Sequence, residues 1–414
     1  MSRLKELIER LCPDGVPFVK LGDYINIYTG DQFNKRDMNS TGSYPVINGG
    51  INPSGFIESY NEPQDTITIS QGGASAGYVA WQDTQFWAGA HCYVIRPNSK
   101  LIINRFLYFF LKNKESYLQQ MQHGAGIPAL NRDKVKELKF PLVPIEVQEE
   151  IVRILDTFSA YAASLQAELQ AELQARKEQY EYYRNLLLTF NPSACGCGTD
   201  GEQEIKVTTC GGGNYEVIWK TMGEIGKFIR GKRFVRTDIV EHGIPCIHYG
   251  DMYTHYGLYA SETPGYINEE IAKKMRFAEK NDVIIVAAGE NKEDLGNALA
   301  WLGDEPAAVH DACFIFKSEM NPNYLSHVCR TRNYHKQVRK FANEAKICSV
   351  SGADLSKVVI PLPPYELQMK IASILDRFET LVNDLTQGLP AEIAAVRERY
   401  EYYRNKLLTF KQAV

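Results

Sequence analysis

Two long segments of the chain carry the apolar spacing of a helix that packs along one face. In the first, apolar residues recur at intervals of three or four, at Ile151, Leu155, Phe158, Ala162, Leu165 and Leu169. This spacing predicts a coiled-coil-like helix over 146–190, roughly 65 Å long at 1.5 Å per residue. Pro-rich phrases at 140–148 and 360–368 are typical of helix starts, so the second segment should begin a similar helix.

The two helical segments are copies of one another, 220 positions apart. YEYYRNLLLTF at 180–190 returns as YEYYRNKLLTF at 400–410, and 26 of the 50 positions match between 141–190 and 361–410. The second copy contains Gly388 and Pro390, which should break or bend its helix. A repeat of this kind predicts a pseudo-twofold molecule.

The segments before each helix are less alike and read as short strands separated by Gly, Asn and Asp turns. The clearest strands are at 65–71, 91–97, 282–288 and 312–318. We therefore expect an α+β fold, with two globular mixed α/β domains separated by two long antiparallel coiled-coil-like helices. The expected bounds are 1–140 for the first domain, 141–190 for the first helix, 191–218 for a linker, 219–360 for the second domain and 361–414 for the second helix.

Composition narrows the class of protein. The chain of 414 residues is 44% hydrophobic and 23% charged, which is ordinary for a soluble globular protein. Its net charge of −4 gives no general attraction to nucleic acid, so such binding would need local basic patches. The N-terminus, MSRLKELIERL, lacks the apolar core of a secretion signal, and no apolar run reaches the roughly 20 residues of a membrane span. We expect a cytoplasmic protein.

Nine cysteines do not indicate a metal site. Cys195, Cys197 and Cys210 are the closest group, but they form a CxC with one distant Cys and no nearby His. A structural zinc site normally has four ligands from paired CxxC-type spacings. We interpret these cysteines as incidental thiols in a linker and expect no metal.

The order of these phrases resembles the specificity subunit of type I restriction-modification enzymes, over the whole length of the chain. The resemblance rests on V-x-L-G-D at 19–23, on G-x-G-I-P-x-L at 124–130 and on P-L-x-P-x-E-x-Q-x-x-I at 141–151. The long helix follows, and the same order then repeats. The second domain departs from the pattern at 346–350, where KICSV replaces the GIP element.

The resemblance implies a protein without chemistry of its own. Each domain would read one half of a split, asymmetric DNA target, and the helices would set the gap between the halves. Two methyltransferase subunits, and two restriction subunits in the full complex, would join it on double-stranded DNA. S-adenosylmethionine, ATP and Mg would belong to those partners, so this chain should need no cofactor.

The absence of catalytic motifs agrees with the interpretation as a protein without chemistry of its own. The chain has no Asn/Asp-Pro-Pro-aromatic phrase of an adenine methyltransferase and no Walker-A lysine loop. The alternatives are a methyltransferase with a cryptic site, a coiled-coil scaffold for protein partners alone, and a stand-alone DNA-binding module of another phage-defence system.

Candidate DNA contacts follow from the chemistry of the duplex, since Lys and Arg neutralise phosphates while polar side chains read base edges. The loop GKFIRGKRFVRTD provides Arg230, Lys232, Arg233 and Arg236, and the corresponding loop of the first domain provides Gln32, Asn34, Lys35 and Arg36. For base readout we select polar residues that follow strands, namely Asn48, Gln71, His248, Asn291 and Lys292. Asn48 precedes two glycines and is equally typical of a turn. A further basic cluster at 330–340 fits a solvated helix face nearly as well as DNA contact.

The repeated YEYYRN block has two interpretations. Aromatic residues with Arg on a helix are typical of protein interfaces, and two near-identical copies would suit two identical partners. The residues concerned are Tyr180, Tyr183, Arg184, Tyr400, Tyr403 and Arg404. Packing of one helix against its twin is an equal alternative, and both stay open at this point.

Overall fold

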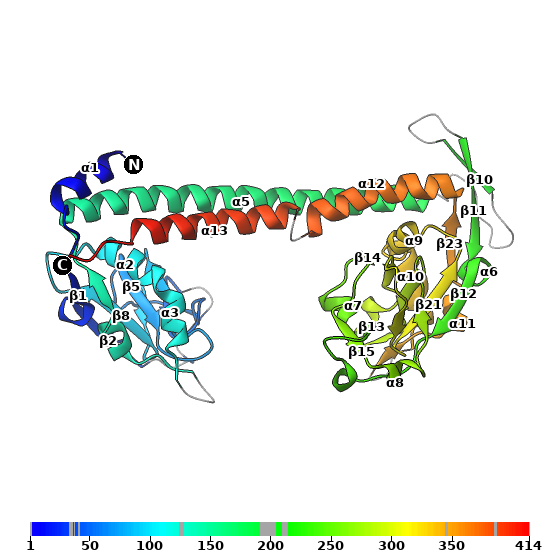
Figure 1. Cartoon of the computed structure of the whole chain (residues 1–414), viewed down its shortest axis with the longest axis horizontal. Coiled ribbons are helices and arrows are strands. Elements are labelled where there is room, and N and C mark those ends of the chain that lie inside the picture. Colours follow the sequence, from blue (N-terminus) through cyan, green and yellow to red (C-terminus); the bar gives the residue numbers. More distant parts are fainter. Residues whose placement is uncertain are drawn as a thin grey trace. The chain divides into compact units, whose positions relative to one another are not determined.

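The chain forms two compact units, each built from two stretches of repeat and one globular domain. The computed structural model describes residues 2–32, 36, 38–39, 42–123, 128–190, 204–208, 214–343, 347–384 and 387–413 (Figure 1). Unit 1 comprises Met1–Glu168 and Ile393–Val414, and unit 2 comprises Leu169–Glu392. The unit boundaries fall inside helices, so α5 (Ile145–Thr189) contributes to both units.

The domain of unit 1 contains two small sheets and a strand pair. Its four-stranded antiparallel sheet has the order β2-β8-β5-β6, and its three-stranded sheet has the order β4-β3-β7. The strands are β1 (Phe18–Lys20), β2 (Ile25–Thr29), β3 (Tyr44–Ile47), β4 (Phe56–Ile57), β5 (Thr66–Ser70), β6 (Val79–Gln82), β7 (Trp87–Ala88), β8 (Cys92–Pro97) and β9 (Lys139–Pro141). The helices are α1 (Ser2–Leu11), α2 (Asn104–Asn113), α3 (Glu115–Gln120) and α4 (Arg132–Lys136).

The domain of unit 2 repeats this plan with additions. Its main sheet, β12-β21-β17-β19-β14, and its second sheet, β15-β13-β20-β16, correspond to those of unit 1. The strands are β10 (Glu204–Thr208), β11 (Asn214–Thr221), β12 (Gly226–Arg230), β13 (Ile244–Ile247), β14 (Tyr259–Ala260), β15 (Gly265–Ile267), β16 (Phe277–Ala278), β17 (Val283–Val286), β18 (Ala288–Gly289), β19 (Ala298–Trp301), β20 (Ala307–Val309), β21 (Cys313–Ser318), β22 (Cys348–Ser349) and β23 (Val359–Leu362). The helices are α6 (Met222–Ile225), α7 (Asp251–Thr254), α8 (Glu269–Ala272), α9 (Pro322–Val328), α10 (Arg332–Phe341) and α11 (Gly352–Leu355).

In unit 1 the domain and the start of the long helix share one hydrophobic core. Ile67 and Ile95 of the main sheet, Phe106 of α2 and Ile151 of α5 are all fully buried in it. The β-branched residues suit the pleated sheet, and the apolar spacing of α5 continues the same core along the helix. The helix is therefore anchored to the domain by burial of apolar surface.

The second repeat is divided into α12 (Tyr365–Asn383) and α13 (Leu389–Leu407), which confirms the predicted break. A Cβ on Gly388 would overlap the carbonyl oxygen of Thr380, so only glycine fits there. Pro390 then lies in the first turn of α13, where its missing N–H costs nothing.

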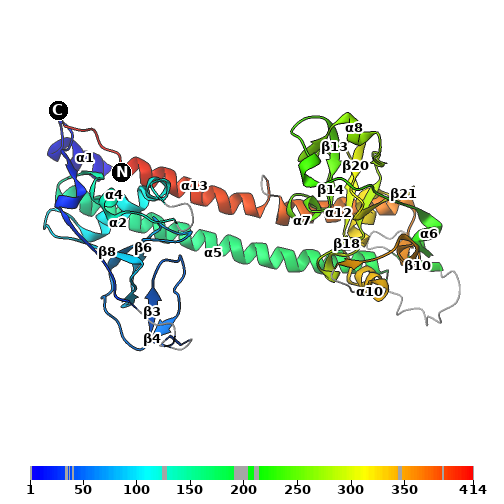
Figure 2. The same ribbon diagram turned by 90° about the horizontal axis from the view of Figure 1, so that it is seen from below.

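The start of each repeat packs on the end of the other. In unit 1, α13 lies antiparallel along α5, with the rings of Phe158 and Tyr403 6.1 Å apart (Figure 2). In unit 2, the ring of Phe378 on α12 stacks on Tyr180 and Tyr183 of α5, at 6.1 and 5.7 Å. Phe158 and Phe378 are 220 positions apart, so the two units use corresponding residues. This packing confirms the predicted antiparallel helices.

A buried glutamine near the start of each repeat fastens the helix to its domain. Oε1 of Gln148 accepts from the backbone N–H of Ile103 at 2.8 Å, and its Nε2 donates to the carbonyl oxygens of Leu101 and Val143 at 2.7 and 2.8 Å. Gln368 accepts from the N–H of Asn321 at 2.9 Å and donates to the oxygen of Pro363 at 2.8 Å. Buried backbone groups need such partners, so the glutamine fixes the junction.

Among the described helices, none combines the length and the apolarity that crossing a lipid bilayer requires.

We expect Gln148→Leu to lower the free energy of unfolding by about 2–3 kcal/mol, because it leaves buried backbone groups at the junction without partners. Urea denaturation followed by circular dichroism measures the change. Gln174→Leu is the matched control, since Gln174 lies exposed on the same helix and bonds only Glu178 among the described residues. Equal losses in both variants would contradict a fastening role for Gln148.

Candidate nucleic-acid interface

In each domain, two parallel strands end side by side at one edge. β3 pairs in parallel with β7, in the register Ile47 to Ala88, and β13 pairs in parallel with β20, in the register Ile247 to Val309. The residues that follow these strands are Asn48 and Gly89 in unit 1, and His248 and His310 in unit 2. Each domain thus presents a corresponding pair of positions, which we call the strand-end edge.

A glycine in each domain lets the predicted DNA-contact loop cross this edge. The N–H of Gly231 donates to the oxygen of Cys313, and the N–H of Lys232 donates to that of Val309, both at 2.9 Å. Gly30 makes the corresponding contact with Cys92 at 3.1 Å. A Cβ on either glycine would overlap a backbone carbonyl of the strand below. Gly30 and Gly231 are 201 positions apart in the sequence, and each lets its loop pass close to the strand below it.

The two histidines of unit 2 form an aromatic cluster at the edge. Their ring centroids are 4.7 Å apart, and Phe234 lies 5.8 Å from His248 and 5.2 Å from His310. Tyr249 stands beside both rings, at 4.7 and 5.3 Å. The cluster forms a mostly buried floor beneath the 231–236 loop.

Basic side chains surround that floor. Arg230, Lys232, Arg233 and Arg236 are all exposed. Nε of Arg230 donates to the oxygen of Asp311 at 2.9 Å, and Nη1 of Arg276 donates to the oxygen of Arg230 at 2.6 Å. The four predicted basic residues therefore share one loop at the strand-end edge, where they can meet phosphates.

The protein environment disfavours the protonated form of both histidines. Burial lowers the pKa of His248 and of His310, with Arg236 and Arg233 lowering them further while Asp251 and Asp311 oppose the shift. Nδ1 of His248 accepts from the N–H of Gly250 at 3.2 Å, and Nδ1 of His310 accepts from that of Ala312 at 3.1 Å. These bonds assign the tautomer that carries its proton on Nε2. In this state Nδ1 of His310 has no proton to offer the Asp311 carboxylate 3.2 Å away.

Unit 1 places other chemistry at the same edge. Oδ1 of Asn48 accepts from the N–H of His91 at 3.0 Å, and the Asn48 side chain occupies the space over Gly89, where a Cβ would lie 2.6 Å from Oδ1. Asn48 is thus a structural link as well as a candidate reader, in line with its interpretation as a turn residue. In the predicted DNA-contact loop of this domain, Gln32 and Arg36 are exposed, whereas Asn34 and Lys35 lie outside the described residues.

The remaining predicted readers belong to segments other than the predicted loops. Gln71 is half-buried, and its backbone links the oxygen of His91 to the N–H of Leu130. Asn291 and Lys292 lie on a separate turn, at η5 (Lys292–Asp294), where Nδ2 of Asn291 donates to Asp294 at 3.3 Å. DNA contact by these residues stays a prediction. His248 is only 6% exposed, so it offers little surface to a base.

The YEYYRN blocks turn part of their surface inward. Tyr180 is 4% exposed, and its hydroxyl lies 3.2 Å from Nδ1 of the buried His327, so it is unavailable as a surface anchor. The Tyr400 hydroxyl lies 2.8 Å from Oγ of Ser159, and Arg404 donates to Asn113 at 3.4 Å. Partner binding stays a prediction for Tyr183, Arg184, Tyr400, Tyr403 and Arg404.

Several residues at these sites were missed from the sequence. His310 and Arg276 join the strand-end edge through strand pairing, which the single sequence does not reveal. Tyr182 and Tyr402, at 63% and 61% exposure, are the most exposed tyrosines of the repeated blocks. The sequence could have indicated this exposure, because a residue two positions from a buried Tyr points to the opposite side of a helix.

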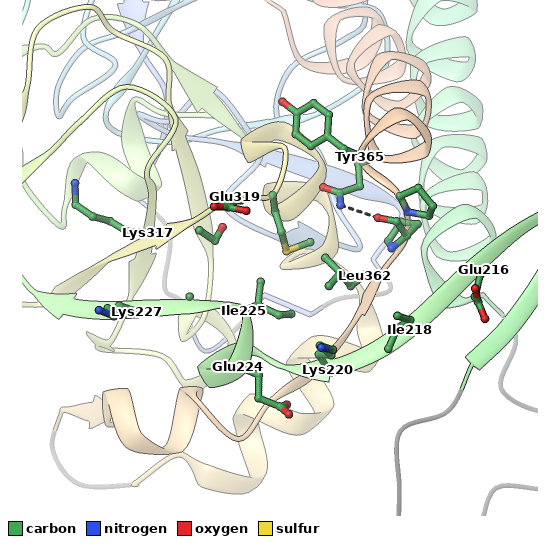
Figure 3. A pocket seen from close by; sticks show the side chains of 16 residues that line it. Glu216, Ile218, Lys220, Glu224, Ile225, Lys227, Lys317, Glu319, Leu362 and Tyr365 are labelled. Atoms are coloured by element: carbon green, nitrogen blue, oxygen red, sulfur yellow. Dashed lines mark hydrogen bonds between the residues drawn. The ribbon is translucent and has the colours of Figure 1, made fainter.

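A groove of about 920 Å³ also lies in unit 2, between β11, β12 and the start of α12 (Figure 3). Glu216, Glu224 and Glu319 line it together with Lys220, Lys227 and Lys317, so its charges balance. A hollow of about 740 Å³ in unit 1, lined by Lys20 and Asp23 among others, occupies the corresponding place. Neither has the positive excess that DNA phosphates require. Among the described residues, no group of three His, Cys, Asp or Glu could hold a metal ion.

Comparison with known proteins identifies this architecture. Residues 13–175 and 216–395 match the family described as the type I restriction modification DNA specificity domain. The chain belongs to this family. It is 29% identical over 398 residues to the putative type I restriction enzyme specificity subunit S.HindORF215P of Haemophilus influenzae, covering 91% of this chain and 90% of the relative. It is 28% identical to the EcoR124I/EcoR124II specificity subunit of Escherichia coli, covering 99% and 97% of the two chains.

A solved structure described as "Structural basis underlying complex assembly and conformational transition of the type I R-M system" shares the fold. The TM-score is 0.58 at 17% identity, covering 96% of this chain and 98% of that chain.

Acid should destabilise unit 2 of the chain through its two edge histidines. Their pKa values lie below the ordinary value of about 6.5, so as the pH falls the unfolded chain takes up protons before the folded one. Stability is thus lost from about pH 6.5 downward. Melting temperatures between pH 7.5 and 5.5 should fall less steeply in the double variant His248→Gln/His310→Gln than in the wild type. His242→Gln, at an exposed histidine, is the control and should keep the wild-type slope.

Proposed function

We propose that this specificity subunit reads an asymmetric bipartite sequence in double-stranded DNA, with one half recognised by each domain. The observation that carries the proposal is the strand-end edge, which has the same backbone in both domains and different side chains. Asn48 beside Gly89 in one domain, and the mostly buried His248 beside His310 in the other, give the two edges different shapes. Two unlike edges on one repeated scaffold support two unlike half-sites.

The basic loop of unit 2 supports contact with the DNA backbone. Four exposed cations within seven residues, held at the edge by the Gly231 crossing, can neutralise phosphates although the whole chain is acidic. Binding by charge neutralisation releases condensed counterions, and its affinity therefore falls as salt rises. The mostly buried floor of histidines and aromatic rings would support this loop from beneath.

The helices of the two repeats would set the distance between the half-sites. α5 runs without interruption for 45 residues and belongs to both units. Its pairing with α13 in unit 1 and with α12 in unit 2 stiffens it, since two packed helices resist bending better than one.

The chemistry of the full enzyme would reside in partner subunits. We assign to this chain no catalytic step and no cofactor, and we place adenine methylation, with S-adenosylmethionine, and ATP- and Mg-dependent cleavage in two methyltransferase and two restriction subunits. Its relatives are specificity subunits, and the solved structure of the same fold is described by the complex assembly of a type I system. The exposed Tyr182 and Tyr402, at corresponding places of the two repeats, would suit two copies of one partner.

Removal of two loop charges tests the DNA assignment. We expect Arg233→Gln/Arg236→Gln to weaken duplex binding by the assembled methyltransferase and to reduce the slope of log affinity against log salt by about two. The control is Lys273→Gln/Lys274→Gln, which removes the same charge from exposed positions at the end of α8. Fluorescence anisotropy at several salt concentrations reports both. Equal effects of the two variants would show a general charge effect and contradict a specific contact.

Lengthening the helices tests the spacing role. One heptad is to be inserted in α5 after Leu169 and a second in α13 before Ile393, because each unit pairs the two repeats and a single insertion would shift that pairing. Seven residues add about 10 Å, close to three base pairs of duplex. Methylome sequencing should show a longer gap between unchanged half-sites. An unchanged gap would refute the ruler, and altered half-sites would place the helices in base readout.

A further inference from the structure

A cavity of about 390 Å³ lies inside unit 2, where four separate segments meet. The end of α5 contributes Tyr180 and Arg184, and α12 contributes Glu379. The segment from α7 onward contributes Tyr253 and Tyr256, and Arg330 reaches the cavity just after α9. We call this the two-arginine cavity.

The charges that line the two-arginine cavity do not balance. Two guanidinium groups, of Arg184 and Arg330, share it with one carboxylate, that of Glu379. Burial lowers the pKa of Arg330, and Arg184 lowers it further, while Glu379 acts in the opposite direction. His335 adds no charge near pH 7, because burial, with the help of Arg330 and Arg339, lowers its pKa to about 4. One partly buried positive charge is therefore left over, which is costly unless an anion joins it.

Hydrogen-bond donors around the cavity are unsatisfied as well. Nε of Arg184, Nε of Arg330 and the hydroxyl of Tyr256 are buried and have no hydrogen-bond partner among the described residues. Arg184 does lie over the ring of Tyr180, at 5.1 Å, which orients its guanidinium group. Buried donors without partners are uncommon in folded proteins, and each calls for a ligand or an explanation.

We propose that the two-arginine cavity binds a phosphate group. The donors come from α5, from the segment after α7 and from the residue just after α9. They can therefore approach a ligand from several sides and not only in one plane. A tetrahedral oxyanion with several acceptor oxygens fits such an arrangement better than a planar carboxylate does. Arginine forks are the side chains that bind phosphate most specifically. The phosphate can come from the DNA backbone or from a free anion.

The position in unit 1 that corresponds to Arg330 is occupied by Lys112, which supplies a matched control. Ile103 of unit 1 and Asn321 of unit 2 occupy corresponding positions, since each donates its backbone N–H to the glutamine near the start of its repeat. Lys112 and Arg330 each lie nine residues further along, so they correspond as well. Nζ of Lys112 is already bonded to Glu115 at 2.6 Å and to the oxygen of Val79 at 3.0 Å. Removing Lys112 therefore breaks an existing pair, whereas removing Arg330 relieves a repulsion.

Occupancy of the cavity would steady the strand-end edge. The N–H groups of both His255 and Tyr256 donate to the oxygen of Asp251 at 3.0 Å, and the N–H of Asp251 donates to the oxygen of His248 at 3.0 Å. A ligand held at Tyr256 thus restrains α7 and, through it, the edge histidine. Two parts of this proposal rest on the proposed function, namely the coupling of the cavity to the strand-end edge and DNA as the source of the phosphate.

The first experiment titrates the full chain with inorganic phosphate against chloride at constant ionic strength. The wild type should rise in melting temperature, by about 5 °C at a hundredfold excess over Kd. Arg330→Met should lose this rise without a fall in its phosphate-free melting temperature. Arg330→Lys, which keeps the charge but not the fork, should bind phosphate about tenfold more weakly. Lys112→Met should melt lower and keep the full phosphate response.

The second experiment identifies the source of the phosphate. With random-sequence duplex, Arg330→Met should reduce the salt slope of the assembled methyltransferase by about one if a DNA phosphate fills the cavity. An unchanged slope together with the lost phosphate response assigns the cavity to a free phosphate.

A wild type that does not respond to phosphate, or an Arg330→Met variant that responds fully, overturns the proposal. If Arg330→Met instead loses affinity for the methyltransferase subunit and phosphate has no effect, the occupant is an acidic side chain of that partner. A wild type that binds phosphate but prefers no bipartite sequence leaves the cavity standing and removes the proposed function.

Discussion

Attachment of each domain to two helices from different repeats is the constraint on which the rest of the structure depends. Gln148 and Gln368 fasten each repeat to its own domain, while Arg404 and Tyr180 bring the end of the other repeat onto it. These polar groups are largely buried, and a buried polar group is costly unless it is paired, so each contact holds its helix in one position. The need to make corresponding contacts twice is a physical reason for the near-identity of the repeats.

The domains combine a shared backbone with unlike surfaces. Glycine crossings and parallel strand ends recur in both, and so does a helix-borne aspartate. Asp156 accepts from Arg105 in unit 1, and Asp376 accepts from Asn323 and pairs with His327 in unit 2. Contacts between each domain and its helix are thus kept, while the side chains at the strand-end edge vary. A scaffold of this kind allows one half-site to change without disturbing the other.

Charge is distributed unequally between the units. Unit 1 contains a buried charge pair, in which Glu62 accepts from Tyr28 at 2.9 Å and pairs with Arg96 at 2.5 Å. Unit 2 leaves positive charge unpaired, on the loop from Arg230 to Arg236 and in the two-arginine cavity. A chain with a net charge of −4 therefore still presents local positive potential.

Local patterns in the sequence determined the two long helical segments, four of the strands and the doubling of the plan. Apolar periodicity predicted α5 to within one residue at each end, Gly388 and Pro390 predicted the break, and alternating segments predicted β5, β8, β17 and β21. Only the tertiary structure decided that Tyr180 turns inward onto His327, that His310 joins His248, and that Arg184 meets Arg330. Each of these pairs is separated by more than 60 positions in the chain. Strand pairing and helix packing bring them together, and no periodicity within one segment records which distant segment will be its neighbour.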